Sequence, residues 1–470
     1  MFLSTEVKEL CNQINTMKPS KFKSKSNSLI AKFKKEWIET MYLLKLYNEG
    51  RTTYSLNFIK VTEYGFSCRI FFVPNCNFEK LDNIREDLQD KFGCLILFKK
   101  KRASQYVDAK FIFNSNNDMK FKLLEYKEPY VLYIGNDYSG QPIFIDMKMY
   151  PHLLITGGTR SGKSVMQTVI LSHLISNFSI RLVELYLCQI AKSDLVLFED
   201  AEQTVSFADD LDKTLITLDY IVNTIMKERD QLIRPYRKKA MASNYHDYNK
   251  LNKGSKIKTS YVVFDEMASL YQSKGDNKQV KDIKLQIIQY IDDVARYGAS
   301  LGVFLVSSLQ RPTADNLSPM VKAQSTAIVS FRQNNMKSSE VATDDGNLAL
   351  GLEQREFVYL LASNSSYGIV PWTKDSEAYE SIKPRLKPNH PNIFYILKLD
   401  SMTKSPIKNK EKIEFNKVKS KTKEEVLAEN IAKIDGFVPY EDHSSKNIID
   451  STKTKKGRER VWLQKGIGKL

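Results

Sequence analysis

One loop between two apolar segments constrains the fold of this chain more than any other feature of its sequence. Residues 157–164 read Gly-Gly-Thr-Arg-Ser-Gly-Lys-Ser and fit the pattern GxxxxGK[ST]. The apolar run at 153–155 predicts a short buried strand before the loop, and apolar residues at helical spacing over 165–178 predict a helix after it. In this order of strand, loop and helix, backbone N–H groups and a helix N-terminus present positive potential to phosphate groups.

The loop therefore predicts a site for ATP and Mg²⁺. Its glycines allow the backbone to curl around phosphates, Lys163 can reach the β- and γ-phosphates, and the Ser164 hydroxyl can bind Mg²⁺. The alternative is a plain turn with a solvated lysine, which the flanking strand and helix disfavour. The predicted nucleotide-binding residues are Gly157, Gly158, Thr159, Arg160, Ser161, Gly162, Lys163, Ser164 and Val165.

Two acidic residues directly follow another predicted strand, at 261–264. Asp265 can hold Mg²⁺ through its water shell, next to Ser164. Glu266 can orient and deprotonate an attacking water. Because aspartate is also a good helix N-cap, the pair alone leaves both interpretations open. Together with the loop upstream, it predicts a metal site at Ser164 and Asp265, and hydrolysis of ATP by water with Glu266 as the base.

Further apolar strands follow the loop, and helical stretches separate most of them. This alternation predicts an α/β fold, a mostly parallel sheet with helices on both faces. One strand ends at Gln310, which would then face the γ-phosphate as a sensor, although a polar residue can also merely end a buried strand. The predicted strands are 181–190, 260–266, 301–310, 326–332 and 356–362, and the helices between them include 208–248 and 280–297.

The 470 residues are enough for more than one core, and the pattern changes along the chain. Residues 18–28 are basic and rich in serine, which predicts a linker, and 29–47 predict a basic amphipathic helix. A β-hairpin is predicted with its turn at 137–140. The predicted division is a basic helical segment and linker at 1–50, a small α+β domain at 51–130, a P-loop ATPase domain at 131–385 and a basic, partly disordered tail at 386–470.

The charge and cysteine content narrow the class of protein. A net charge of +16 suits a polyanionic partner without identifying one. No apolar run approaches the roughly 20 residues of a membrane span. The five cysteines form no CxxC pair, so neither a zinc site nor a disulfide framework is predicted. These features predict a cytoplasmic protein with reduced thiols.

Longer stretches between residues 133 and 372 carry a family resemblance. They include PHLLITGGTRSGKSV, MKERDQLI followed by MASNYHDYN, YVVFDEMASL, DDGNLALGL, and the stretch from VARYGASLG through SSLQRP to IVSFR. With these residues the chain resembles the FtsK/SpoIIIE family of ring-forming, DNA-translocating ATPases. The resemblance implies a RecA-like motor domain, homo-hexamers around single- or double-stranded DNA, and ATP bound at subunit interfaces.

In such rings an arginine from one subunit acts on the ATP of its neighbour. Arg296 resembles this arginine finger, and Arg332 is the second candidate. The family commonly has an acidic residue and a proline before the lysine on the second strand, whereas this chain has Cys-Gln-Ile-Ala-Lys-Ser-Asp at 188–194.

A compact motor with a basic tail is similar to the branch of the family found on mobile elements. That branch implies a coupling or DNA-transfer ATPase of conjugation, with a relaxase and membrane channel proteins as further partners that recruit it to the inner face of the membrane. Two alternatives stay open: a secretion ATPase of the same superfamily that moves proteins, and a nucleotide-dependent assembly switch with negligible hydrolysis.

Overall fold

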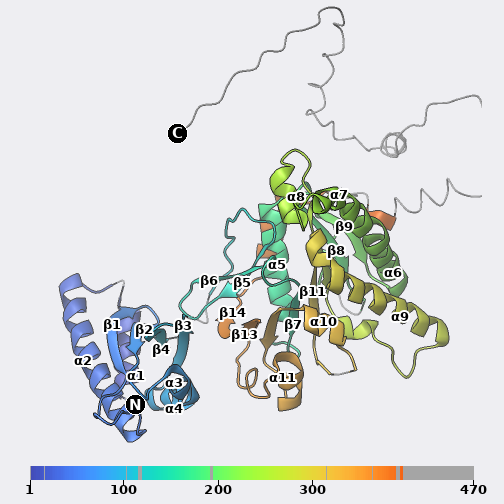
Figure 1. The fold of residues 1–470 in the computed structure, drawn as a ribbon. Coiled ribbons are helices and arrows are strands. Elements are labelled where there is room, and N and C mark those ends of the chain that lie inside the picture. Colours follow the sequence, from blue (N-terminus) through green and yellow to red (C-terminus); the bar gives the residue numbers. More distant parts are fainter. Residues whose placement is uncertain are drawn as a thin grey trace, which may run out of the picture. The chain divides into compact units, whose positions relative to one another are not determined.

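The computed structural model describes residues 2–14, 16–101, 103–114, 119–190, 194–313, 315–362, 364–387 and 392–394 (Figure 1). The tail predicted at 386–470 therefore lies almost wholly outside the described residues. Among the helices within these ranges, none is both long enough and apolar enough to cross a bilayer.

The first part of the chain forms an α+β unit in which four helices and a four-stranded antiparallel sheet share one core. The sheet has the order β1-β2-β4-β3, in keeping with the α+β character predicted for residues 51–130. The elements are α1 (Phe2–Asn12), α2 (Pro19–Leu43), β1 (Ser55–Thr62), β2 (Gly65–Phe71), α3 (Phe78–Asn83), α4 (Arg85–Phe92), β3 (Leu95–Lys100) and β4 (Tyr106–Ile112).

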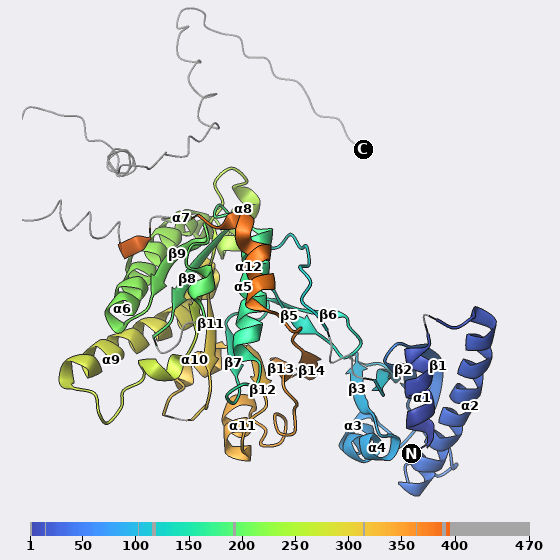
Figure 2. The same cartoon turned by 180° about the vertical axis from the view of Figure 1, so that it is seen from behind.

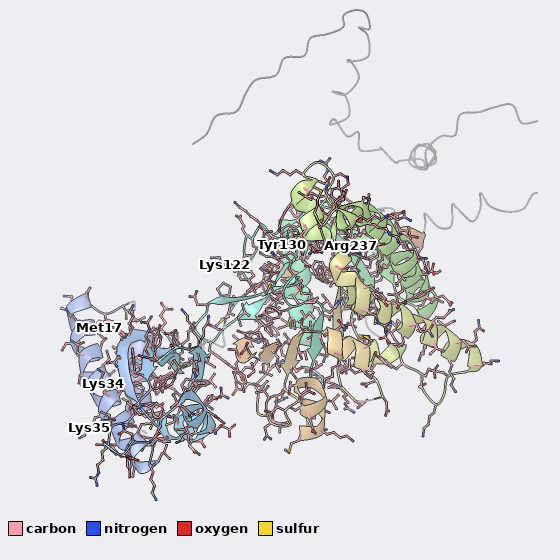
Figure 3. The ribbon with its side chains drawn as sticks, viewed as in Figure 1. Met17, Lys34, Lys35, Lys122, Tyr130 and Arg237 are labelled. Carbon is pink, nitrogen blue, oxygen red and sulfur yellow. The ribbon has the colours of Figure 1, made fainter. Side chains whose placement is uncertain are left out.

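The linker predicted at 18–28 is wrong, because these residues lie in helix α2 from Pro19 onward. Proline is well suited to the first turn of a helix, where its missing N–H has no intrahelical partner. The helix is amphipathic as predicted: Phe33 and Trp37 are fully buried, while Lys34 and Lys35 point outward (Figure 3). The segment at 1–50 is thus part of the α+β unit rather than a tether to it.

The second part of the chain contains a ten-stranded sheet with helices on both faces (Figures 1 and 2). Its order is β6-β5-β14-β13-β12-β7-β11-β10-β8-β9. The six strands from β12 to β9 run parallel, and the other four pair antiparallel. The strands are β5 (Val131–Asn136), β6 (Pro142–Asp146), β7 (Leu153–Thr156), β8 (Val183–Cys188), β9 (Thr204–Ala208), β10 (Thr259–Phe264), β11 (Val303–Leu309), β12 (Ala327–Phe331), β13 (Glu356–Leu361) and β14 (Asn364–Ile369).

Each predicted strand of this sheet is present, as is the predicted hairpin of β5 and β6. The helical stretch predicted at 208–248 is broken after Lys238, and α8 begins at Tyr245. The helices are α5 (Lys163–Asn177), α6 (Leu211–Tyr220), α7 (Lys227–Lys238), α8 (Tyr245–Leu251), α9 (Lys278–Asp293), α10 (Pro319–Gln324), α11 (Met336–Thr343) and α12 (Asp375–Ile382). Shorter turns are η1 (Val196–Phe198), η3 (Met267–Leu270), η5 (Ala299–Leu301) and η6 (Lys383–Arg385), and the π-helical segments are η2 (Ile221–Met226) and η4 (Val294–Gly298).

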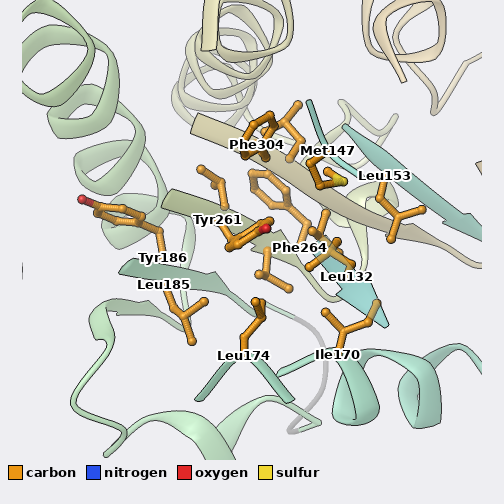
Figure 4. Packing of buried hydrophobic residues seen from close by; sticks show 14 of the residues in the cluster. Leu132, Met147, Leu153, Ile170, Leu174, Leu185, Tyr186, Tyr261, Phe264 and Phe304 are labelled. Carbon is orange, nitrogen blue, oxygen red and sulfur yellow. The ribbon is translucent and has the colours of Figure 1, made fainter. Parts of the chain in front are cut away.

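Buried side chains of the central parallel strands form the core of this second part (Figure 4). Leu185 on β8, Tyr261 on β10 and Phe304 on β11 are at most 1% exposed, and Ile170 and Leu174 of α5 pack in the same cluster. The strands read as nearly continuous apolar runs because a parallel sheet covered on both faces has no solvent-facing side. Because the sheet is buried and rigid, it fixes the positions of the residues at the ends of its strands.

We expect Phe304→Ala to lower the free energy of unfolding by about 3–5 kcal/mol, because a fully buried ring is replaced by a cavity. Leu232→Ala is the control, since Leu232 is 49% exposed and its loss should change stability by less than about 0.5 kcal/mol. Urea unfolding followed by circular dichroism measures both. Equal losses in the two variants would contradict the assignment of this core.

Candidate active site

The predicted phosphate-binding loop lies between β7 and α5 and has a backbone that requires glycine. Gly157 has φ 150° and Gly162 has φ 127°, values that residues with a Cβ rarely adopt. A Cβ on Gly157 would lie 2.6 Å from Cβ of Phe331, and one on Gly162 would lie 2.8 Å from Cε1 of the same ring. The Phe331 side chain at the end of β12 therefore packs directly against the loop.

Three neighbouring segments hold the loop through backbone hydrogen bonds. The Gly158 N–H donates to the Arg332 carbonyl at 2.9 Å, and the Gly157 N–H donates to the Leu309 carbonyl at 3.3 Å. On the other side, the Arg355 N–H donates to the Ser161 carbonyl at 2.8 Å. The carboxyl ends of β11 and β12 and the residue before β13 thus fix the shape of the loop.

Lys163 and Ser164, the residues predicted to contact phosphate and Mg²⁺, begin helix α5. The Lys163 side chain is buried, and its Nζ donates to the carbonyls of Gly157 and Gly158 at 2.7 and 3.1 Å. The ammonium group is therefore held inside the curve of the loop. The Ser164 hydroxyl donates to Oδ2 of Asp194 at 2.6 Å, which adds a carboxylate that the sequence prediction did not include.

The acidic pair directly follows β10, with only β11 between it and the strand of the loop. Asp265 is 2% exposed. Oε1 of Glu266 accepts hydrogen bonds from the backbone N–H groups of Gln310 and Ala268, at 3.2 and 3.3 Å. Its Oε2 is buried and accepts no hydrogen bond from the described part of the chain. One carboxylate oxygen of Glu266 thus caps η3.

Gln310, the predicted sensor, lies at the end of β11 beside the acidic pair. Its backbone fixes Glu266, and its side chain lines a cavity of about 270 Å³ together with Arg311, Gln333, Asn334, Asn335 and Ser338. Asn334 belongs to the same region as the loop, because a Cβ on Gly158 would lie 3.0 Å from its Oδ1. The structure therefore brings Gln310 to the loop, while its contact with a γ-phosphate stays a prediction.

The two candidate arginine fingers lie at opposite edges of the sheet. Arg296 is exposed on η4, just before β11 begins, and its guanidinium lies 5.5 Å from the centre of the Tyr297 ring. Arg332 follows β12 at the carboxyl edge, where its carbonyl binds the loop of its own chain. Since these strands are parallel, Arg296 is remote from this chain's own loop and Arg332 is next to it.

The oxygen atoms gathered here suit Mg²⁺. Hydroxyl and carboxylate oxygens are the ligands this ion prefers, and the hydrogen-bonded pair of Ser164 and Asp194 would supply them together with the predicted ligand Asp265. No group of three or more His, Cys, Asp or Glu side chains among the described residues could hold a metal by itself. The ion would therefore need phosphate oxygens of the nucleotide to complete its coordination, as is usual for Mg²⁺ bound with ATP.

Sequence reasoning missed Asp194 and Arg355. Asp194 comes a few residues after the carboxyl end of β8, which is where a parallel sheet places residues of its site, so its position was a usable signal. Arg355 contributes through its backbone N–H, which no sequence pattern reveals.

Residues 119–314 match the FtsK/SpoIIIE family. The chain is 28% identical over 232 residues to DNA translocase FtsK of Campylobacter jejuni, an alignment that covers 48% of this chain and 22% of that protein. It is 30% identical over 225 residues to DNA translocase FtsK of Helicobacter pylori, covering 47% and 25%. The chain thus spans about a quarter of the length of these curated relatives.

A solved structure, the monomer form of the pCW3 conjugation coupling protein TcpA with ATPgS, matches with a TM-score of 0.50 and 21% identity. The match covers 75% of this chain and 99% of that one, and it supports the shared fold. The predicted α/β fold with a mostly parallel sheet is confirmed. Residues 119–314 of this chain are therefore similar to the FtsK/SpoIIIE family, and the described fold is similar to that of an ATPgS-bound coupling protein.

Proposed function

We propose that this chain hydrolyses ATP to move DNA. The observation that carries the proposal is that the end of β11 holds both parts of the site: the Leu309 carbonyl accepts from the loop at 157–164, and the Gln310 N–H donates to Glu266. These residues lie in the region that matches the FtsK/SpoIIIE family. Backbone N–H groups hold one carboxylate oxygen of Glu266, and the other oxygen is buried with no hydrogen-bond partner among the described residues, so it could accept a proton from a water molecule in the site.

Each residue of the site would have a separate role in hydrolysis. The loop N–H groups and Lys163 would bind the phosphates, and Ser164 and Asp265 would hold Mg²⁺, which neutralises phosphate charge when bound. Oε2 of Glu266 would accept a proton from the attacking water. Gln310 is fixed beside it and would respond to the γ-phosphate.

DNA is the partner that fits the charge of the chain and the names of its relatives. Both curated relatives are named DNA translocases, and a net charge of +16 favours binding to a phosphate backbone through release of counterions. The likeness to a conjugation coupling protein supports a role in DNA transfer, with a relaxase, a membrane channel and the inner face of the membrane as its surroundings. A homo-hexamer would place Arg296 of one subunit at the ATP of the next.

Lys163→Ala should abolish ATP hydrolysis, and Glu266→Gln should lower turnover by about 10²–10⁴-fold while leaving ATP binding intact, because only the base is lost. Turnover is measured by phosphate release with single-stranded DNA, duplex DNA, a secreted polypeptide and no addition, and binding by a fluorescent ATP analogue. The matched control is Glu340→Gln, a change at an exposed glutamate on α11. Full turnover in Glu266→Gln would refute the assignment of the base, and stimulation by the polypeptide alone would favour protein secretion.

Mixing inactive variants distinguishes the two arginines. If Arg296 acts on the neighbouring subunit, a mixture of Arg296→Ala and Lys163→Ala chains should regain ATPase activity, since one chain supplies the site and the other supplies the arginine. An equal mixture of Arg332→Ala and Lys163→Ala should stay inactive, because Arg332 lies at its own loop. The reverse pattern of activities would make Arg332 the finger.

Asp194→Asn should raise the Mg²⁺ concentration needed for half-maximal ATP-analogue binding by about 3- to 10-fold, because Ser164 loses a charged hydrogen-bond acceptor. Asp282→Asn, an exposed change on α9, serves as the comparison and should leave the titration unaltered. Identical Mg²⁺ titrations for the two variants would show that Asp194 has no part in the metal site.

A further inference from the structure

A second concave site lies at the edge of the sheet opposite the ATP site. Its cavity of about 780 Å³ is bordered by Leu182 just before β8, Thr259 at the start of β10 and Ser300 just before β11. These strands are parallel to β7, whose carboxyl end leads into the phosphate-binding loop. The cavity is therefore at the amino edge and shares no residue with the active site. Tyr130, labelled in Figure 3, is part of its wall.

Lysines dominate the charged side chains of this site, which we call the lysine pocket. The carboxylates in its lining are Glu128 and Asp247, and Asp247 pairs with Lys250 at 3.1 Å. Lys148 contacts Asp146 at 3.9 Å and lies 4.3 Å from the centre of the Tyr130 ring. The lysines of the pocket are Lys127, Lys148, Lys250, Lys253 and Lys256.

Three of these lysines form no ion pair within the described part of the chain. Lys127, Lys253 and Lys256 are exposed, and no ion pair joins any of them to another described residue. They come from two segments far apart in the sequence, one before β5 and the other between α8 and β10. Like charges around a cavity repel one another unless an anion binds between them. The lysines therefore give the pocket a positive potential that favours a negatively charged ligand.

Aromatic rings form the wall between these lysines. The rings of Tyr130 and His246 meet edge to face at 4.6 Å, and the rings of Tyr245 and His246 are 3.8 Å apart. Nε2 of His246 is buried and has no hydrogen-bond partner among the described residues. Burial first, and then the positive charge of Lys148, lowers the pKa of His246 to about 4, so the imidazole is neutral near pH 7.

We propose that the lysine pocket binds the phosphodiester backbone of nucleic acid, at a contact separate from the ATP site. The inference rests on the proposed function, which supplies DNA as the partner. Lysine is a flexible point charge that suits sequence-independent contact with phosphates, and lysines beside aromatic rings are the combination with which proteins hold nucleic-acid strands. A translocating enzyme needs such sequence-independent contacts because it must hold every stretch of DNA alike.

The test replaces Lys127, Lys253 and Lys256 together by Gln. Binding of fluorescent single-stranded and duplex DNA is followed by anisotropy over a range of salt concentrations. Each phosphate contact contributes about 0.9 to the slope of log affinity against log salt for duplex DNA and about 0.7 for single strands. The triple variant should therefore lose about two to three units of slope and bind DNA more weakly, on whichever form of DNA the pocket holds.

Two further variants control for charge and folding. The same three lysines replaced by Arg should retain the wild-type slope, and neutralisation of three exposed lysines elsewhere, Lys274, Lys278 and Lys374, should leave it unchanged. Binding of the fluorescent ATP analogue reports that each variant is folded. If the wild-type protein binds DNA and the Gln variant shows the same slope of log affinity against log salt, the assignment of the lysine pocket is wrong and the proposed function is unaffected. Wild-type protein that binds no DNA would overturn the proposed function and the pocket with it.

Discussion

The site depends on the parallel alignment of β7, β11 and β10. In this register Leu309 lies beside Thr156 and Ser307 lies beside Phe264, so the three strands end at the same edge of the sheet. Hydrogen bonds then join the segments that follow them: the Leu309 carbonyl accepts from the loop, and the Gln310 N–H donates to Glu266. An additional strand between β7 and β10 would separate Glu266 from the loop at 157–164, so the proximity of the two follows from the strand order.

The sequence was sufficient to predict those site residues that directly follow or lie near the end of a strand. Lys163, Asp265 and Gln310 each come directly after or near the end of an apolar run, and a parallel sheet brings such ends together. Contacts made by distant segments were not predictable: Phe331 packs against the glycines because β12 pairs with β7, and no local pattern encodes that pairing. Strand β14, with the polar sequence Asn-Ser-Ser-Tyr-Gly-Ile, forms because pairing with β13 outweighs its weak strand propensity.

The linker prediction failed for a related reason. Charge and serine content suggested a solvated segment, yet Ser26, Leu29 and Phe33 are buried at helical spacing and continue the face that carries Trp37. The apolar signal began only at Leu29, whereas the helix began at Pro19, where composition was misleading. Helix α2 is ordered by its packing on the sheet, and the polar first turns follow as an extension of the packed part.

Strand β11 lies between Arg296, the candidate arginine finger, and Gln310, the predicted sensor. Arg296 precedes its amino end, and Gln310, which fixes Glu266, follows its carboxyl end. At the amino end, the guanidinium of Arg229 donates to the carbonyls of Leu301 and Gly302 at 3.0 and 3.1 Å and pairs with Glu184 at 3.2 Å. Breaking such a buried charge pair is costly, so this end of the strand is firmly anchored. Because every residue of β11 is buried, the strand is a tightly packed connection between the segment that carries Arg296 and the backbone N–H of Gln310 that holds Glu266.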